Sequence, residues 1–257
     1  MPSPSPASNS DCVRIAVLGD VHGNLEALQA VLAEARALGA TRIVQTGDVV
    51  GYGPDPGTCL EILRESEATI CLGNHDAAVL GTLSTDYFNP YARAAVEWTR
   101  QQLTGEQMDE LASLPLVVED PDFTLVHGSL HEPAAFGYVA SVVEAEDSLR
   151  LQSHRICFVG HTHVPGFFGV SRSDQDLQVC FDPEFSMSIG GFEKSLVNVG
   201  SVGQPRDEDP RAAFVLFEPE QGTVRLHRVR YDLERTQQKI LAAGLPTVLA
   251  DRLRLGV

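Results

Sequence analysis

Five short apolar runs in this chain each end in a segment that carries Asp, His or Asn. Each run has four residues and is rich in β-branched or other apolar side chains, which is typical of buried strands. Open α/β sheets bind ligands at the carboxyl ends of their strands. We therefore expect a fold that gathers these polar groups along one rim. The runs are 15–18 before Gly19-Asp20-Val21-His22, 42–45 before Gly47-Asp48, 69–72 before Gly73-Asn74-His75-Asp76, 123–126 before His127-Gly128, and 156–159 before Gly160-His161-Thr162-His163.

The order of the predicted elements indicates an α/β fold with two layers of strands. Strands alternate with amphipathic helices as far as about residue 76, which favours βαβ units. Strands predominate after Gly166, and helical sequence returns from about residue 233 to 255. No repeat of fixed period and no linker divides the sequence. We predict a four-layer α-β-β-α sandwich of two mixed sheets with flanking helices.

Helical signals interrupt the alternation between about residues 77 and 122. Asn89-Pro90 can open one helix, and Thr104 with Gln107 forms a capping box for another. This insertion directly follows the third polar segment, so it is predicted to overhang the polar rim as a cap. A cap that selects substrates and a plain cover for the sheet are equal alternatives. With 43 % hydrophobic residues, we expect 12–257 to form a single domain that includes this insertion.

The composition indicates which cellular compartment and which binding partners to expect. The net charge of −16 repels nucleic acid and anionic membranes, so we expect neither duplex nucleic acid nor a membrane as partner. A homo-oligomer stays open. The five cysteines are an odd number without metal-site spacing, which indicates reduced thiols and a cytoplasmic location. Residues 1–11 lack the basic and apolar regions of a signal peptide and are predicted to be a flexible tail.

The polar segments together offer carboxylate, amide and imidazole donors for two metal ions. One carboxylate can give an oxygen to both ions, and Asp48 is the best candidate for this bridge. Asp20 and His22 are two residues apart, so on a strand they would share a face. Mixed N/O ligation without thiolates favours two divalent ions per chain, with Mn²⁺ preferred and Fe²⁺ or Zn²⁺ as alternatives. The assignment is Asp20, His22 and His163 to one ion, Asn74, His127 and His161 to the other, and Asp48 to both.

These segments (DxH, GD, GNHD, a lone His and GHTH) resemble the calcineurin-like metallophosphoesterase superfamily over about residues 14–206. Asp20-Val21-His22-Gly23-Asn24 and the segment 198–206 resemble its small bacterial and archaeal phosphodiesterase branch. The resemblance implies the metal assignment given above. It also implies that His75 is catalytic and acts on the scissile phosphate beside the metals. Candidate substrate contacts are Asn24, Asn198 and Arg206, with a helix N-cap as the alternative for Asn24 and an ordinary turn for the other two.

One departure from the family pattern bears on the substrate. Ser/Thr protein phosphatases and symmetric dinucleoside tetraphosphatases carry Arg-Gly soon after Gly-Asp, whereas Asp48 here precedes the Arg-free segment 49–53. A clamp that favours dianionic monoesters is missing at this place, although Arg93 or Arg206 could replace it. The positive charge of two divalent ions is about one unit larger than the negative charge of two Asp carboxylates and one hydroxide. A monoanionic diester would neutralise this remaining charge. The sequence predicts a binuclear phosphodiesterase that attacks small phosphate esters with metal-activated hydroxide.

Two other functions stay open. The chain could be a nucleotide or dinucleoside-polyphosphate phosphatase, because the missing Arg counts only against the symmetric tetraphosphatases. It could also be a non-enzymatic protein-binding scaffold, as in the vacuolar sorting subunit that resembles these phosphoesterases. Intact candidate ligands together with His75 count against the scaffold. The neighbouring Asp76 is predicted to cap a helix and not to orient His75, because adjacent side chains point apart.

Overall fold

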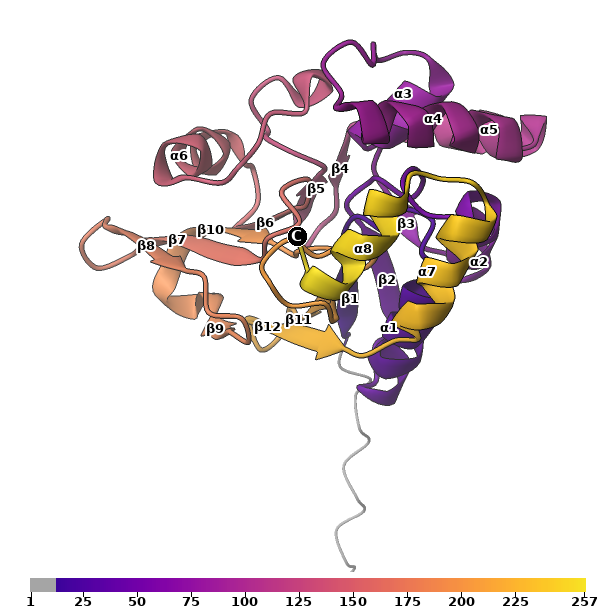
Figure 1. Ribbon diagram of the computed structural model, residues 1–257. Helices are drawn as coiled ribbons and strands as arrows, with labels where there is room; N and C mark the ends of the chain where they lie inside the picture. Colours follow the sequence, from indigo (N-terminus) through magenta and orange to yellow (C-terminus); the bar gives the residue numbers. More distant parts are fainter. Residues whose placement is uncertain (1–12) are drawn as a thin grey trace, which may run out of the picture.

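The computed structural model describes residues 13–257, in which helices lie outside two packed sheets (Figure 1). The strands are β1 (Ile15–Leu18), β2 (Arg42–Gln45), β3 (Thr69–Ile70), β4 (Val117–Glu119), β5 (Thr124–Val126), β6 (Ile156–Val159), β7 (Gly166–Ser171), β8 (Leu177–Cys180), β9 (Ser186–Ser188), β10 (Phe192–Asn198), β11 (Ala212–Glu218) and β12 (Thr223–Val229). The helices are α1 (Leu25–Ala37), α2 (Pro56–Glu65), α3 (Asn74–Leu80), α4 (Pro90–Gln102), α5 (Gly105–Ala112), α6 (Val142–Leu151), α7 (Leu233–Ala242) and α8 (Thr247–Leu255). Two 3₁₀ turns, Pro133–Ala135 and Ile189–Gly191, complete the set.

Both sheets are mixed, and each has a parallel part that carries the polar segments. The first has the order β3-β2-β1-β11-β12-β9, in which β1, β2 and β3 are parallel and β11 is antiparallel to β1. The second has the order β4-β5-β6-β10-β7-β8, in which β5, β6 and β10 are parallel. The predicted four-layer sandwich of two mixed sheets is confirmed.

Apolar side chains from both sheets fill the space between them. Val17 of β1 lies in the same apolar cluster as Leu125 and Phe158 of the second sheet, and all three side chains are fully buried. The alternate residues of β1, Ala16 and Leu18, face the helices on the outer side. Because β1 is covered on both faces, its sequence is continuously apolar and does not alternate with polar residues.

Several helices begin where the sequence predicts their caps. Asn24 and Asn89 each accept a hydrogen bond from a backbone N–H in the first turn of α1 and α4. Thr104 and Gln107 form the predicted capping box of α5. Asp55 precedes the proline that opens α2, but its side chain makes no cap hydrogen bond and pairs with a lysine of α7 instead.

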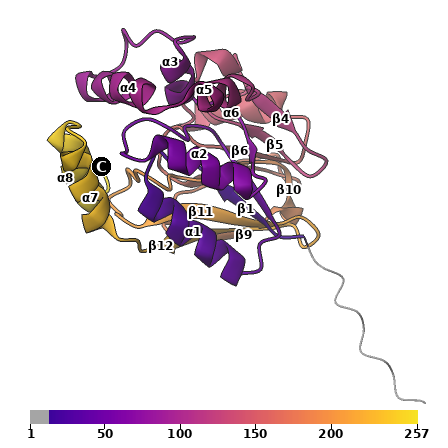
Figure 2. The same ribbon diagram turned by 90° about the vertical axis from the view of Figure 1, so that its right-hand side faces the viewer.

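The predicted helical insertion, about residues 77–122, contains the end of α3, all of α4 and α5, and also the strand β4. The three helices form one group above the strands (Figures 1 and 2). Because α3 begins at Asn74, this group lies directly beside the polar rim. Its role as a substrate-selecting cap stays a prediction.

Helix α6 and the short strands β4 and β9 were not predicted from the sequence. A capping signal for α6 was present, because Ser141 accepts a hydrogen bond from the Glu144 N–H and the Glu144 carboxylate reaches back to the Ala140 N–H.

Cys59, Cys71 and Cys157 are free and buried, and Cys180 is free and half-buried. The expectation of reduced cysteines stays a prediction. Within residues 13–257, no helix is long and apolar enough to cross a membrane. The predicted flexible tail, residues 1–11, lies outside the described residues.

Candidate metal centre

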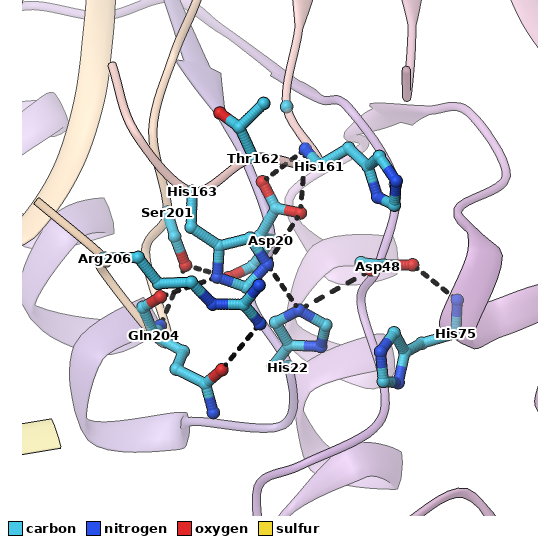
Figure 3. Close-up of polar contacts among 12 residues, drawn as sticks. Asp20, His22, Asp48, His75, His161, Thr162, His163, Ser201, Gln204 and Arg206 are labelled. Atoms are coloured by element: carbon cyan, nitrogen blue, oxygen red, sulfur yellow. Dashed lines mark hydrogen bonds and ion pairs between the residues drawn. The ribbon is translucent and has the colours of Figure 1, made fainter. Parts of the chain in front are cut away.

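The seven predicted ligands lie in loops just beyond the strands or at the start of a helix. The loops from the two sheets meet at one rim, so residues far apart in the sequence face one another (Figure 3). Each of the seven side chains is at most 9 % exposed, which excludes bulk water from most of the site. Asp20 and His22 follow β1, Asp48 follows β2, Asn74 opens α3 after β3, His127 follows β5, and His161 and His163 follow β6.

Five of these residues have a left-handed backbone conformation. The φ angles are +43° at Asp20, +49° at His22, +59° at Asp48, +67° at His161 and +61° at His163. Such conformations cost roughly 1–3 kcal/mol each for residues other than glycine and are typical of functional sites. The interpretation of Asp20 and His22 as strand neighbours was wrong, since β1 ends before both. The direction of these two side chains is therefore set by the left-handed backbone of the loop and not by the alternation of a strand.

The first cluster contains Asp20, His22, Asp48 and His163, whose ligand atoms all lie within 4.8 Å of one another. The Nε2 atoms of His22 and His163 are 3.2 Å apart. Each Nδ1 faces a backbone carbonyl oxygen, at 3.0 Å for His22 and 2.6 Å for His163. A carbonyl can only accept, so each Nδ1 carries the proton and each Nε2 turns a lone pair toward the other. A cation between them removes this repulsion, so the donor set fits a metal ion.

The second cluster contains Asp48, His127 and His161, with Asn74 beside them. His127 Nδ1 is 2.9 Å from the Thr46 carbonyl oxygen, so in the neutral ring Nδ1 carries the proton and Nε2 has the lone pair. That Nε2 lies 2.9 Å from Asn74 Oδ1 and 3.1 Å from His161 Nδ1. An imidazole lone pair, an amide oxygen and a second imidazole therefore converge on one place. This arrangement also fits a divalent cation.

Asp48 belongs to both clusters. Its Oδ2 atom lies 3.5 Å from His22 Nε2 and 3.4 Å from His127 Nε2. Its other oxygen, Oδ1, accepts a hydrogen bond from the His75 backbone N–H at 2.8 Å, which fixes the carboxylate plane. The structure thus brings all seven predicted side chains together in the predicted division. The binding of two ions by them stays a prediction.

Burial sets the protonation state of several imidazoles in the site. It lowers the pKa of His22 and His163 well below the usual value, that of His161 to about 3 and that of His75 to about 4. These rings are therefore neutral near pH 7, which is the state in which imidazole ligates a metal.

The carboxylates and His127 are coupled by their charges. Burial would raise the pKa of Asp48, but the charges of His127 and His75 outweigh it and lower that pKa well below its usual value. Burial opposes protonation of His127 as well, yet the Asp48 charge raises the pKa of His127 to about 9. Burial also raises the pKa of Asp20 to about 7. A bound cation would favour the ionised carboxylates and the neutral imidazole that ligation requires.

His75 lies beside the two clusters and is in neither of them. Its ring is 4.8 Å from the His22 ring and 4.4 Å from the Tyr52 ring. Its Nδ1 atom is buried without a hydrogen-bond partner among residues 13–257. The Asp76 carboxylate accepts hydrogen bonds from the backbone N–H groups of Gly73, Asp48 and Val50. Its predicted role as a helix cap is confirmed, and it also holds the Asp48 loop against α3.

Two glycines allow the loops to approach closely. A Cβ atom at Gly73 would collide with the backbone N and the Oδ1 of Asp48. Gly51 has a φ of +87°, and a Cβ atom there would lie 2.5 Å from His75 Nδ1. Only glycine therefore fits at these places, because Asp48 and His75 occupy the space of a side chain.

The three candidate substrate contacts differ in what their side chains bind. Asn24 caps α1 and also binds Gly203 and Thr236, whereas Asn198 holds the His161 loop through Gly160 and Thr162. Both side chains are buried and use their polar atoms in these bonds. Arg206 is half-buried, and its guanidinium carbon lies 5.7 Å from the Tyr52 ring centroid. Substrate contact by these three residues stays a prediction.

Two aromatic neighbours of the site were not predicted from the sequence. Tyr52 packs on His22 and His75, and Tyr138 stacks on His161. An aromatic residue between two glycines in the loop after Asp48 was a signal for Tyr52. No sequence pattern marks Tyr138, because only the tertiary fold brings it to the site.

Comparisons with known proteins agree with this geometry. Residues 13–222 match the calcineurin-like phosphoesterase superfamily domain. A protein of Methanocaldococcus jannaschii is 36 % identical over 251 residues, which are 94 % of this chain and 98 % of that protein. The crystal structure of a metallophosphoesterase from Sphaerobacter thermophilus is 40 % identical, with a TM-score of 0.83 over 96 % of this chain and 100 % of that one. A structure from Pyrococcus horikoshii has the same fold at 21 % identity, with a TM-score of 0.76 over 95 % and 99 % of the two chains.

The chain belongs to the calcineurin-like phosphoesterase superfamily. Membership implies a phosphoester hydrolase that binds divalent metals, and the two His/Asp clusters are its candidate metal ligands. The predicted recognition of this family is confirmed.

Proposed function

We propose that this protein is a binuclear metal-dependent phosphodiesterase. The observation that carries the proposal is the position of Asp48, whose Oδ2 atom faces both ligand clusters at 3.5 and 3.4 Å. A carboxylate shared in this way would hold both ions of a divalent metal pair together with the other six ligands. Such a pair supplies a nucleophilic hydroxide near neutral pH and compensates the charge of phosphoryl oxygens. Mn²⁺ is the preferred ion of this proposal, with Fe²⁺ or Zn²⁺ as alternatives.

The charge of the site favours a monoanionic ester. Asp20 and Asp48 are the only carboxylates in the two clusters, and Asn74 and the imidazoles are neutral donors. Two divalent ions therefore exceed the charge of these ligands and one hydroxide by about one unit. A phosphodiester neutralises this excess. A phosphomonoester brings a second negative charge that needs another cation.

Arg206 is the side chain that supplies such a cation. Its guanidinium donates to Gln204 Oε1 at 2.9 Å, its Nε has no partner within residues 13–257, and its charge helps to lower the pKa of His22 and His163. Arg93, the other arginine considered, is bound to the carbonyl groups of Thr85 and Asp86 instead. In this proposal Arg206 binds a non-bridging phosphoryl oxygen and sets the residual activity on monoesters.

His75 is the protein group that acts on the ester without binding a metal. Because its pKa is lowered to about 4 by burial, the ring is neutral near pH 7 and acts as a hydrogen-bond donor to developing oxyanion charge. Tyr52 and His22 pack against the ring and hold its orientation.

A pair of chromogenic esters tests the proposal. We expect bis-p-nitrophenyl phosphate to be cleaved with higher kcat/KM than p-nitrophenyl phosphate, with the same Mn²⁺ concentration and pH. The Arg206→Ala variant should lose more activity on the monoester than on the diester, and Arg225→Ala, an exposed arginine of β12, is the matched control. A preference for the monoester would contradict the diesterase proposal. Absence of metal-dependent turnover of either ester would contradict the proposal that the protein is an active phosphoesterase.

A further inference from the structure

A pocket of about 320 Å³ adjoins the second cluster. The buried residues Asn74, His75 and His161 form its inner end, so the pocket opens directly onto the candidate metal centre. One wall comes from residues 83–92, which connect α3 to α4 and begin α4. The opposite wall comes from residues 135–138 of the loop before α6, and Figure 1 shows both segments on the upper side of the molecule.

Aromatic rings dominate the lining of this pocket. The Tyr138 ring stacks on the His161 ring with centroids 4.0 Å apart and planes inclined by 24°. Phe88 lies 5.1 Å from His75 on the other wall, and Tyr52 lies at its side. The rings thus stand on both sides of a space whose inner end carries the candidate ligands. A flat group entering it would contact ring faces.

Two tyrosine rings of the pocket lining are exposed to water. Tyr138 is 54 % exposed and Tyr87 is 98 % exposed, and both line the pocket from opposite walls. Large exposed apolar groups beside a concave site are typical of ligand-binding surfaces. Covering them with a planar ligand would remove apolar area from water on both walls, and this contributes roughly 25 cal/mol per Å².

The charge of the lining specifies the occupant further. No Lys, Arg, Asp or Glu side chain is among the described residues that line the pocket. The side chain of Asn89 is already engaged as the N-cap of α4, and the Ser84 hydroxyl donates to Asp86. A second phosphate or a carboxylate would therefore find no counter-charge here. The pocket suits a neutral planar group that is esterified to a phosphate at the metal centre.

We propose that this pocket binds the nucleobase of a small nucleotide phosphodiester. Nucleobases are neutral and planar, and stacking on aromatic side chains contributes roughly 1–3 kcal/mol per base without strict sequence preference. A volume of about 320 Å³ is at the lower end for small-molecule sites and admits one nucleoside, not an extended strand. The inference rests on the proposed function, because the metal pair must hold the phosphate.

Two phosphate esters that differ only in the base test this inference without requiring turnover. The dissociation constants of AMP and of ribose 5-phosphate are measured by calorimetry on the full chain loaded with Mn²⁺. Released phosphate is assayed after each titration to exclude hydrolysis. We expect AMP to bind about 5- to 150-fold more tightly, which corresponds to a stacking contribution of roughly 1–3 kcal/mol.

Variants of Tyr138 assign this difference to the pocket. Tyr138→Leu should weaken the binding of AMP and leave the binding of ribose 5-phosphate unchanged, so that the two dissociation constants become several-fold more similar. Tyr138→Phe should retain the difference between them. Tyr91→Leu is the matched control, because Tyr91 is 51 % exposed on α4 and does not line the pocket.

Three results would overturn the inference. Equal dissociation constants in the wild-type protein, or a ratio unaffected by Tyr138→Leu, would show that the base does not bind here and would leave the phosphoesterase proposal standing. Failure of both compounds to bind the Mn²⁺-loaded protein, together with absence of diester turnover, would overturn both proposals.

Discussion

Replacing His75 by Ala should slow diester hydrolysis strongly while leaving the metal centre intact. The side chain provides no atom to either ligand cluster, and the Asp48 carboxylate is held by the His75 backbone N–H, which Ala retains. We therefore expect the variant to bind as many ions as the wild-type protein. The loss should appear in kcat, because the ring is proposed to act on charge that develops in the transition state.

The magnitude follows from the protonation state of the ring. A protonated imidazole acting as a general acid would contribute roughly 10²–10⁴-fold. With its pKa lowered to about 4 by burial, His75 is neutral near pH 7 and donates a hydrogen bond. Removing one such donor from a buried site costs roughly 10²–10³ in kcat, or about 2.7–4 kcal/mol. Because a group with this pKa does not titrate near neutrality, the ratio of wild-type to variant activity should stay constant from roughly pH 6 to pH 9.

The assay is steady-state hydrolysis of bis-p-nitrophenyl phosphate with Mn²⁺, combined with metal analysis of the same samples. His131→Ala is the control, since His131 is exposed and absent from both clusters. Thermal unfolding of each variant reports any loss of stability from the removed ring. Loss of metal from His75→Ala would make His75 a ligand and refute the reasoning. A kcat of the His75→Ala variant equal to that of the wild-type protein would show that His75 has no catalytic role.

Three further outcomes follow from the same geometry. Chelation of the metals should lower the Tm by about 5–11 °C for each ion present at 100 times its Kd, since such binding contributes about 2.7 kcal/mol; an unchanged Tm would contradict a resident metal pair. Gly73→Ala should abolish activity and metal retention, because its Cβ would collide with Asp48, whereas Gly105→Ala, which meets no atom within 4 Å, should be neutral or slightly stabilising in a thermal melt. Burial raises the pKa of the Cys71 and Cys157 thiols, so iodoacetamide should label Cys180 in the native protein and label these two only after unfolding, as read by peptide mass spectrometry.

The strands that carry the site were predictable because burial on both faces leaves a continuous apolar run. β1, β2 and β6 match their predicted ranges, and the polar segments after them are where the loops begin. The run 69–72 forms only a two-residue strand, since the chain turns there toward α3 and the ligand Asn74. Local patterns therefore located the elements, while the tertiary contacts of the site set their ends.

The orientation of the ligands was not predictable from the same patterns. The left-handed backbone at Asp20 and His22 is imposed by close packing of the loops against one another, which no periodicity records. The separation of His161 and His163 into different clusters has the same origin, because both residues have positive φ angles in the loop after β6.

The aromatic pocket lay beyond the reach of sequence analysis for a different reason. Tyr138 is in a loop without periodic pattern, and its neighbour His161 follows a strand of the second sheet. Their contact exists only because the sandwich brings the loop before α6 onto the rim. The insertion that carries Phe88 was recognised as helical, but its contribution to a pocket depends on the opposite wall.

Metal content per chain is the most direct test of the central claim that Asp48 serves two ions. Wild-type protein, Asp48→Asn and Asn74→Ala are loaded with Mn²⁺, freed of excess metal and analysed by inductively coupled plasma mass spectrometry. The account predicts two ions per chain in the wild-type protein. In Asp48→Asn an amide NH₂ can replace the shared Oδ2, so both ions should be lost. Asn74→Ala should retain the ion of the first cluster, because Asn74 lies beside the second cluster only. Two ions per chain and normal diester turnover in Asp48→Asn would contradict it.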